Sequence, residues 1–485
     1  MSPATERAVD VPEWVQDAVF YQIFPDRFAK SARVPKPSGL EPWSAPPTVH
    51  GYKGGDLLGV VERLDHLEAL GVSALYLNPI FRSASNHRYH THDYHHVDPL
   101  LGGDAALREL LDAAHARGMR VVLDGVFNHA SRGFLQFNDI MENGERSPYL
   151  DWFRVRRFPL NAYGGGEIGY DAWWNLPALP KLNTATPAVR EYLWDVGERW
   201  LAFGADGWRL DVPNEIDDDA FWREFRRRCR AVNGECYLVG EIWEDAGRWL
   251  TGDQFDAVMN YPLTRAIYGY VGRGRGLAEP ELARSGLRRI RPLDAAGFAE
   301  ALGGLLERYP RAIVQAQLNL LGSHDTPRAK TVLLDDDAAL RLAYLLLFTL
   351  PGAPCVYYGD EIGLAGGHDP ACRNAVPWDD EDAWDRALLA RLGRLAALRR
   401  ERPALRRGGT AVLAATGDVL VYGRDLEGGR LLVAMNAGDE EAVLPADTGM
   451  KGRFRELLEG REVTLEAGRT RLPARAGWLL EPVPG

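Results

Sequence analysis

Two strand-like runs between residues 206 and 241 each end in a carboxylate, and this stretch constrains the fold more than any other. The first run leads to Asp211 and the second to Glu241. The polar, arginine-rich segment 217–232 between them is long enough for one helix, which is the crossover that two parallel strands need. The stretch therefore predicts a βαβ unit. In a closed parallel barrel, both carboxylates would emerge at the end where catalytic residues gather.

A pair of carboxyl groups suits the cleavage of a glycosidic bond, because one acid protonates the leaving oxygen while the other is ionised. Arg209 lies two residues before Asp211, so both side chains share one face of a strand, where the arginine would keep Asp211 anionic. Glu241 has apolar neighbours, which raise a carboxyl pKa and suit a general acid. The alternative is a buried Asp–Arg pair beside an ordinary surface glutamate, and these residues alone do not exclude it.

Strand and helix patterns alternate along most of the chain, which predicts an α/β fold. Besides the two runs above, β-rich runs lie at 18–24, 72–77, 120–123, 255–263, 317–321 and 355–358. Helical patterns lie at 57–70, 105–117, 186–203, 340–350 and 386–400. Eight strands with intervening helices are what a (β/α)8 TIM barrel needs.

Two further parts are predicted. The connection after the third strand is unusually long and rich in aromatic residues, which predicts an inserted subdomain that covers one side of the cleft. From about Gly408, short β-rich runs with glycine turns predict a C-terminal all-β sandwich domain. The predicted domains are the catalytic barrel at 1–129 and 187–405, the inserted subdomain at 130–186 and the β-sandwich at 406–485.

The loop 78–103 holds five of the eleven histidines, which are His87, His90, His92, His95 and His96. A metal site is one interpretation, but the spacing matches no helical His-x-x-x-His pair and no cysteine assists. The pattern instead favours a polar wall, together with Tyr89, Tyr94 and Asp98, that stacks on sugar rings and binds hydroxyls.

Composition limits the class of partner and the compartment. The net charge of −11 over 485 residues disfavours nucleic acid as a partner. The four cysteines show neither close pairing nor metal-ligand spacing, which is typical of free thiols in a reducing compartment. No apolar run nears the ~20 residues of a membrane span, and segment 1–14 lacks the basic and apolar regions of a signal peptide. We expect a cytoplasmic protein that does not bind membranes.

Four motifs lie in order at predicted strand ends: DGVFNH at 124–129, GWRLDVPNE at 207–215, GEIW at 240–243 and GSHDT at 322–326. Supporting motifs are GVSALYLNPIF at 71–81, LPKLN at 179–183 and DPACR at 369–373. On these residues the chain resembles the alpha-amylase family, glycoside hydrolase family 13, and most of all its neopullulanase, cyclomaltodextrinase and maltogenic amylase branch. The resemblance runs from about Ala18 to Trp378.

The resemblance implies a role for each matching residue. Asp211 matches the nucleophile, Glu241 the general acid/base, and Asp325 a third carboxylate that binds hydroxyls of the distorted sugar. The implied substrate contacts are Arg209, His129, His324, Asp124 and Tyr94 around the attacked sugar, Trp243 on the leaving side, and Asp369 and Arg373 at the next sugar on the non-reducing side. A retaining reaction of this kind requires no cofactor.

Three features depart from the branch. Its members usually begin with a β-domain of ~120 residues that builds a dimer, and the first barrel strand here begins too early for one, so we expect a monomer or weak oligomer. Segment 30–33 stands where many relatives hold calcium, but it lacks their Asn/Asp cluster and only Asp56 remains nearby, so we expect no calcium there. Glu244 stands where many relatives carry histidine, so we expect a change either in leaving-side preference or in transfer to sugar acceptors.

The residues and the resemblance together predict a retaining hydrolase of α-1,4 links in maltodextrins, starch, pullulan or cyclodextrins. They leave α-1,6 hydrolysis and transglycosylation open, because loop geometry decides which acceptor is used. An α-glucosidase or 4-α-glucanotransferase on the same scaffold is a second hypothesis. A non-catalytic glucan-binding or scaffold barrel is a third, against which the intact Asp211, Glu241 and Asp325 argue.

Overall fold

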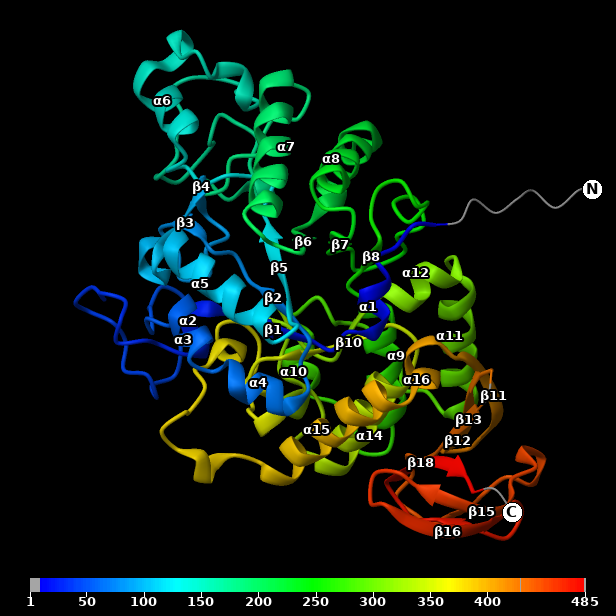
Figure 1. Cartoon of the computed structure of the whole chain (residues 1–485). Coiled ribbons are helices and arrows are strands. Elements are labelled where there is room, and N and C mark those ends of the chain that lie inside the picture. Colours follow the sequence, from blue (N-terminus) through cyan, green and yellow to red (C-terminus); the bar gives the residue numbers. More distant parts are fainter. Residues whose placement is uncertain (1–8, 428, 484–485) are drawn as a thin grey trace, which may run out of the picture.

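Eight parallel strands form the centre of the computed structural model, which describes residues 9–427 and 429–483 (Figure 1). The prediction for segment 1–14 thus falls largely outside the described residues. The strands are β1 (Phe20–Ile23), β2 (Ala74–Leu77), β5 (Arg120–Gly125), β6 (Gly207–Leu210), β7 (Tyr237–Gly240), β8 (Ala257–Val258), β9 (Leu318–Leu320) and β10 (Ala353–Tyr357). Their order in the sheet is β8, β7, β6, β5, β2, β1, β10, β9. A parallel bridge between Met259 and Leu318 joins the two outer strands, so the predicted barrel is confirmed.

Helices surround the barrel, and every residue of β1, β2, β6, β7 and β10 is buried, as expected for parallel strands covered on both faces. The longer helices are α5 (Gly103–Ala116), α7 (Pro187–Ala202), α8 (Asp219–Val232), α9 (Tyr261–Val271), α11 (Ala295–Glu307), α14 (Asp337–Thr349) and α15 (Arg386–Glu401). The shorter ones are α1 (Glu13–Asp17), α2 (Pro25–Phe28), α3 (Leu57–Val61), α4 (Leu64–Leu70), α10 (Glu279–Leu282), α12 (Arg311–Ala316), α13 (Ala329–Val332) and α16 (Pro403–Arg407). The helix predicted over 57–70 is thus two helices, separated at Glu62 and Arg63.

The long connection after β5 folds as a compact insert beside α7 (Figure 1). It contains α6 (Leu135–Asn143), and isolated antiparallel bridges join Val155 to Tyr170 and Phe153 to Leu182. Several of its aromatic side chains, including Phe134, are buried in its interior. A separate hairpin of β3 (Phe81–Ser83) and β4 (Thr91–Val97) follows β2.

The C-terminal part is a six-stranded antiparallel sheet with a two-stranded second layer, which realises the predicted all-β domain. The sheet contains β11 (Gly409–Thr416), β12 (Val419–Leu426), β13 (Gly429–Asn436), β18 (Ala476–Pro482), β15 (Lys451–Glu456) and β16 (Arg461–Glu466), and the second layer contains β14 (Ala442–Val443) and β17 (Arg471–Leu472). One face of the sheet, including Tyr422 and Leu479, joins the core of the barrel domain. The other face, including Val421 and Leu480, packs beneath the second layer.

Within residues 9–427 and 429–483, no helix combines the length and the apolar character that crossing a bilayer demands.

Candidate active site

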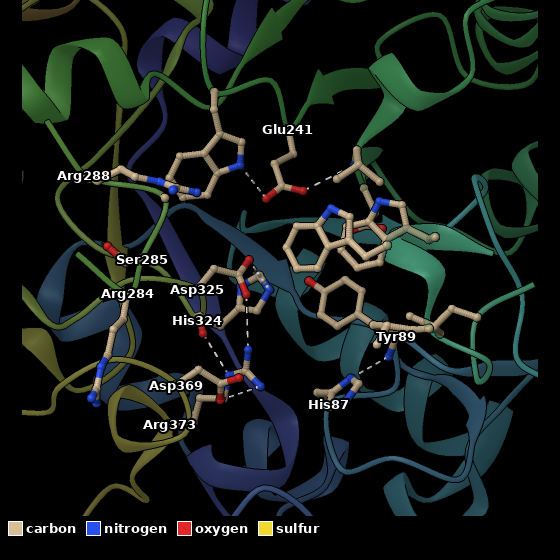
Figure 2. Close-up of a pocket in the computed structure, with 18 of the residues that line it drawn as sticks. His87, Tyr89, Glu241, Arg284, Ser285, Arg288, His324, Asp325, Asp369 and Arg373 are labelled. Carbon is tan, nitrogen blue, oxygen red and sulfur yellow. Dashed lines mark hydrogen bonds and ion pairs between the residues drawn. The ribbon is translucent and has the colours of Figure 1, made fainter. Parts of the chain in front are cut away.

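A cavity of about 910 Å³ opens at the carboxyl ends of the barrel strands (Figure 2). Asp211 directly follows β6, Glu241 directly follows β7, and Asp325 lies beyond the end of β9. All three predicted catalytic carboxylates line this cavity. They converge because the carboxyl ends of parallel strands open at the same end of a barrel.

One fully buried guanidinium links the carboxylates beneath the cavity floor. Arg209 Nη1 lies 2.9 Å from Asp124 Oδ1 and 3.1 Å from Asp211 Oδ1, and its Nη2 lies 2.8 Å from Glu241 Oε2. Because a single guanidinium contacts both Asp211 and Glu241, these two carboxyl groups are close neighbours. Retaining glycosidases use a pair of carboxyl groups about 5 Å apart.

Burial controls the ionisation of this pair. It raises the pKa of Asp211 well above its ordinary value and also raises the pKa of Glu241, while Arg209 opposes both shifts. Arg209 contacts Asp211 as predicted, but it does not bring the pKa of that carboxyl below its ordinary value. The main reason is the burial of Asp211, and the neighbouring carboxylates Glu241 and Asp124, which share the same guanidinium, raise its pKa further. The two buried carboxyls therefore titrate as a pair.

The third carboxylate has the opposite character. Burial alone would raise the pKa of Asp325, but the charge and hydrogen bond of His324, with the charge of Arg373, hold it well below its ordinary value. His324 Nε2 lies 2.9 Å from Asp325 Oδ2, and Arg373 Nη2 lies 3.2 Å from Asp325 Oδ1. Arg373 Nη1 also lies 2.9 Å from Asp369 Oδ1, so the predicted Asp369–Arg373 pair is present at the cavity wall.

Tyr89, not Tyr94, forms part of the cavity wall. The Tyr94 side chain is fully buried, and its single O–H points between the backbone oxygens of Val126 and His129, each 2.8 Å from the hydroxyl oxygen, so its predicted contact with substrate does not fit the structure. Tyr89 lines the cavity and stacks on His324 with ring centroids 5.2 Å apart. Its hydroxyl donates to Asp124 Oδ2 at 2.8 Å. Tyr89 was predicted only as part of the aromatic wall.

Aromatic rings border the rest of the cavity. Trp243 lines it as predicted, donates from Nε1 to Glu241 Oε1 at 3.2 Å, and stacks on Tyr261. His129 also lines the cavity and stacks on Trp173 of the insert with centroids 5.2 Å apart. Burial lowers the pKa of His129 to about 3, so its ring is neutral near neutral pH.

The remaining predicted residues divide between two layers. His129, Trp243, His324, Asp369 and Arg373 line the cavity, whereas Asp124 and Arg209 lie behind its wall. The sequence does not single out several lining residues, which include Leu176, Arg284, Ser285, Arg288 and Arg289. They belong to connecting segments whose path over the barrel no local pattern reveals.

Backbone strain occurs directly beside Asp211. Val212 has a φ of +35°, a conformation that a β-branched residue rarely adopts. Its N–H donates to Glu241 Oε2 at 3.3 Å, and Pro213 follows it. Such strain persists where surrounding contacts enforce it, and it is concentrated at functional sites.

The five histidines of segment 78–103 do not converge on one point. Only His87 and His90 line the cavity, while His95 pairs with Asp195 and His96 with Asp93. Across the described ranges, 9–427 and 429–483, no group of three or more His, Cys, Asp or Glu side chains is arranged to hold a metal ion.

The segment where relatives hold calcium does not fit a cation. Asp56 is fully buried, and its Oδ1 accepts from the Gly59 N–H at 2.7 Å. Its Oδ2 accepts from the Ser31 N–H at 2.9 Å and lies 2.7 Å from Lys36 Nζ. Calcium prefers six to eight oxygen ligands, whereas here an ammonium group already occupies the position facing the carboxylate.

Comparison with known proteins agrees with the geometry. A family model described as the alpha amylase catalytic domain matches residues 22–390. A cyclomaltodextrinase from Geobacillus thermopakistaniensis (strain MAS1) is 43% identical over 94% of this chain and 75% of its own length.

Two solved structures are also similar over nearly the whole chain. Ttha1563 from Thermus thermophilus is 51% identical, with a TM-score of 0.92, and the match covers 96% of this chain and 99% of that one. A debranching enzyme from Nostoc punctiforme, soaked with acarbose, is 44% identical with a TM-score of 0.87, and the match covers 98% and 100% of the two chains.

Proposed function

This chain belongs to the alpha-amylase family, in its cyclomaltodextrinase, neopullulanase and maltogenic amylase branch, and from that premise we propose how its cavity works. The protein is an α-glucan hydrolase of this type. We assign it the cleavage of α-1,4 links in maltodextrins, starch, pullulan or cyclodextrins by a retaining mechanism. The observation that supports this assignment best is the contact of Arg209 with both Asp211 and Glu241 at the cavity floor.

In the first proposed step, Asp211 attacks the anomeric carbon while Glu241 donates its proton to the leaving oxygen. The bond to the leaving sugar breaks as the bond to Asp211 forms. In the second step, Glu241 takes a proton from water, and the resulting attack releases the sugar from Asp211. Burial raises the pKa of both carboxyls, so the pair can hold one proton at working pH, as a donor and a nucleophile together require. We place that proton on Glu241, because the family resemblance assigns it the role of acid/base.

Asp325 has a different proposed role. It remains ionised because His324 and Arg373 lower its pKa. An anion in this position accepts hydrogen bonds from sugar hydroxyls and favours the positive charge that develops on the sugar ring. The ring of Tyr89, stacked on His324, offers an apolar surface for the same sugar.

Linkage and acceptor are finer assignments. We propose α-1,6 hydrolysis as a further activity, supported by the similar protein from Nostoc punctiforme that is named a debranching enzyme. Transfer to a sugar acceptor, as in a 4-α-glucanotransferase, is favoured by the aromatic rings of Trp173, Trp174 and Trp243 at the cavity, which suit a second sugar.

The proposed setting is cytoplasmic, because all four cysteines are buried free thiols. We further propose that the protein is a monomer or weak oligomer, that it requires no cofactor and holds no calcium at the site after the first strand, and that it binds neither nucleic acid nor membranes. Light scattering across a range of protein concentrations tests the oligomeric state.

Sugar release from maltotetraose, pullulan and cyclodextrin tests the function. The wild type is expected to act on at least one of them, and Asp211→Asn is expected to lose activity by at least about a thousandfold. An unchanged melting temperature would show that the variant is folded. Equal, negligible activity of both proteins on all three glucans would contradict the hydrolase assignment.

A further inference from the structure

Three arginines on one loop give part of the cavity an unbalanced positive charge. Arg284, Arg288 and Arg289 are exposed and line the cavity, and in Figure 2 Arg284 and Arg288 lie across from Tyr89 and His87. Within the described part of the chain, no carboxylate lies within ion-pair distance of these three guanidinium groups; Arg284 contacts only His368, with Nη1 3.3 Å from Nε2.

The carboxylates near this loop are already engaged. Glu244 pairs with Arg265 at 2.9 Å, and Glu281 accepts a hydrogen bond from the His368 N–H at 2.7 Å. Asp369 pairs with Arg373 at 2.9 Å. The three loop arginines are therefore uncompensated cations on this side of the cavity, in a protein whose net charge is −11.

The loop lies on the leaving-group side of the scissile bond. A Cβ added to Gly286 would come 2.5 Å from the Trp243 ring, so the loop backbone lies directly on that indole. Arg265 ties the two together, since its guanidinium donates to the backbone oxygens of Trp243 at 3.2 Å and Gly286 at 3.5 Å. Trp243 in turn donates to Glu241, the proposed proton donor to the leaving oxygen.

We propose that this loop is a phosphoryl-binding subsite, which accepts a leaving or acceptor glucose unit that carries a phosphate group. The proposal rests on the proposed hydrolase function, because it uses Glu241 to define the leaving side. Guanidinium groups match the geometry of phosphate oxygens and bind them through paired hydrogen bonds. A sugar phosphate carries a charge of about −1.5 to −2 near neutral pH.

Product inhibition provides the test. Glucose, glucose 6-phosphate and inorganic phosphate are compared as inhibitors of maltotetraose hydrolysis at constant ionic strength, because exposed charges are screened by salt. Glucose 6-phosphate is expected to have an inhibition constant at least about tenfold lower than that of glucose. Equal constants for the two sugars would overturn the proposal. Inorganic phosphate that inhibits as strongly as glucose 6-phosphate would also overturn it, since the site would then bind the free anion alone.

Variants test whether the loop is responsible. In Arg288→Gln/Arg289→Gln, the ratio of the inhibition constant of glucose to that of glucose 6-phosphate is expected to fall towards one. Arg288→Lys/Arg289→Lys is expected to restore part of this ratio. The matched control, Arg341→Gln/Arg400→Gln, removes two exposed arginines from helices α14 and α15 outside the cavity and is expected to keep the ratio. A ratio unchanged in the loop variant would overturn the proposal. Absence of maltotetraose hydrolysis in the wild type would instead contradict the proposed function.

Discussion

At the residue scale, the carboxylates of the site have few positively charged neighbours. Arg209 contacts Asp124, Asp211 and Glu241, so it cannot neutralise all three. Asp325 has partners of its own in His324 and Arg373. Burial therefore raises the pKa of Asp211 and Glu241 despite Arg209, whereas His324 and Arg373 outweigh burial and lower the pKa of Asp325. The pair can carry a proton, while Asp325 stays ionised.

Glu241→Gln tests the assignment of the proton donor. With maltotetraose, the variant is expected to lose activity by about a hundredfold to ten-thousandfold, the usual contribution of general acid–base catalysis. With α-maltosyl fluoride, whose leaving group departs without a proton, release of fluoride is expected to retain far more of its rate. Rates on the two substrates that fall by the same factor would contradict the assignment.

The same variant tests the coupling of the pair through its pH profile. Asp211 must be ionised to attack, so activity is lost as pH falls through its pKa. The charge of Glu241 raises the pKa of Asp211. Replacing it with neutral Gln removes this repulsion, so the acid limb for α-maltosyl fluoride is expected to lie at lower pH than in the wild type. An acid limb at higher pH would contradict this coupling, and one at the same pH would show that Glu241 is protonated, and therefore uncharged, while Asp211 ionises.

Tyr89 and Tyr94 offer a matched pair of substitutions. Tyr89→Ala removes the ring that lines the cavity, and kcat/KM is expected to fall by at least about tenfold. Tyr94→Phe removes the hydroxyl that donates to the backbone oxygens of Val126 and His129, so it is expected to lower stability by about 1–3 kcal/mol while kcat/KM is retained. Steady-state kinetics and thermal melts of both variants test this. A larger loss of kcat/KM in Tyr94→Phe than in Tyr89→Ala would indicate that Tyr94 contacts the substrate.

The sequence predicts the carboxylates better than it predicts their surroundings. Asp211 and Glu241 follow strands, and the fold fixes where strand ends lie. Tyr89 and Tyr94 lie in the same segment, and only the tertiary fold decides which ring faces the cavity. The pKa of Asp211 is not predictable from its spacing to Arg209 for a similar reason, because spacing shows neither how deeply the carboxyl is buried nor which carboxylates other strands bring to it.

At the element scale, the barrel strands were predictable because buried parallel strands form short continuous apolar runs. The insert was predictable as a unit but not in its internal path, since few regular hydrogen-bonded strands define it. The division of the predicted helix 57–70 into α3 and α4 was also missed, because the apolar spacing continues across the break.

The first of these helices provides a prediction about metal dependence. Asp56 caps α3 and holds Lys36, so the ammonium takes the place of a structural cation. The melting temperature is expected to be the same with and without EDTA. Lys36→Met is expected to lower stability by about 1–2 kcal/mol, because it leaves a buried carboxylate without its charged partner.

Lys451→Met, which removes an exposed lysine from β15, provides the control for that variant and is expected to melt like the wild type. A melting temperature that falls on chelation in the wild type would indicate a bound cation and contradict the prediction.

At the scale of the whole molecule, the C-terminal sheet is part of the main core and not a separate appendage. The face that carries Tyr422, Met435 and Leu479 belongs to the same buried cluster as the barrel helices, whereas the opposite face forms its own small cluster under β14 and β17. The short β-rich runs and glycine turns of the sequence located this domain, but they did not indicate which face of the sheet packs on the barrel.

Gly477 lies at the closest point of that contact, and its substitution tests whether the two parts unfold together. An added Cβ would lie 2.6 Å from Leu345 Cδ2 and 2.9 Å from Leu342 Cδ2 of α14. Gly477→Val is therefore expected to lower stability by about 1–3 kcal/mol through overpacking. Because the core is shared, the melting temperature and the temperature at which activity is lost are expected to fall by the same amount.

Gly409→Val is the control. Its added Cβ would meet only the backbone oxygen of Asp425 at 3.8 Å, so neither the melting temperature nor the temperature at which activity is lost is expected to change. Two separate transitions in Gly477→Val, with activity lost only in the second, would show instead that the sheet unfolds independently of the barrel.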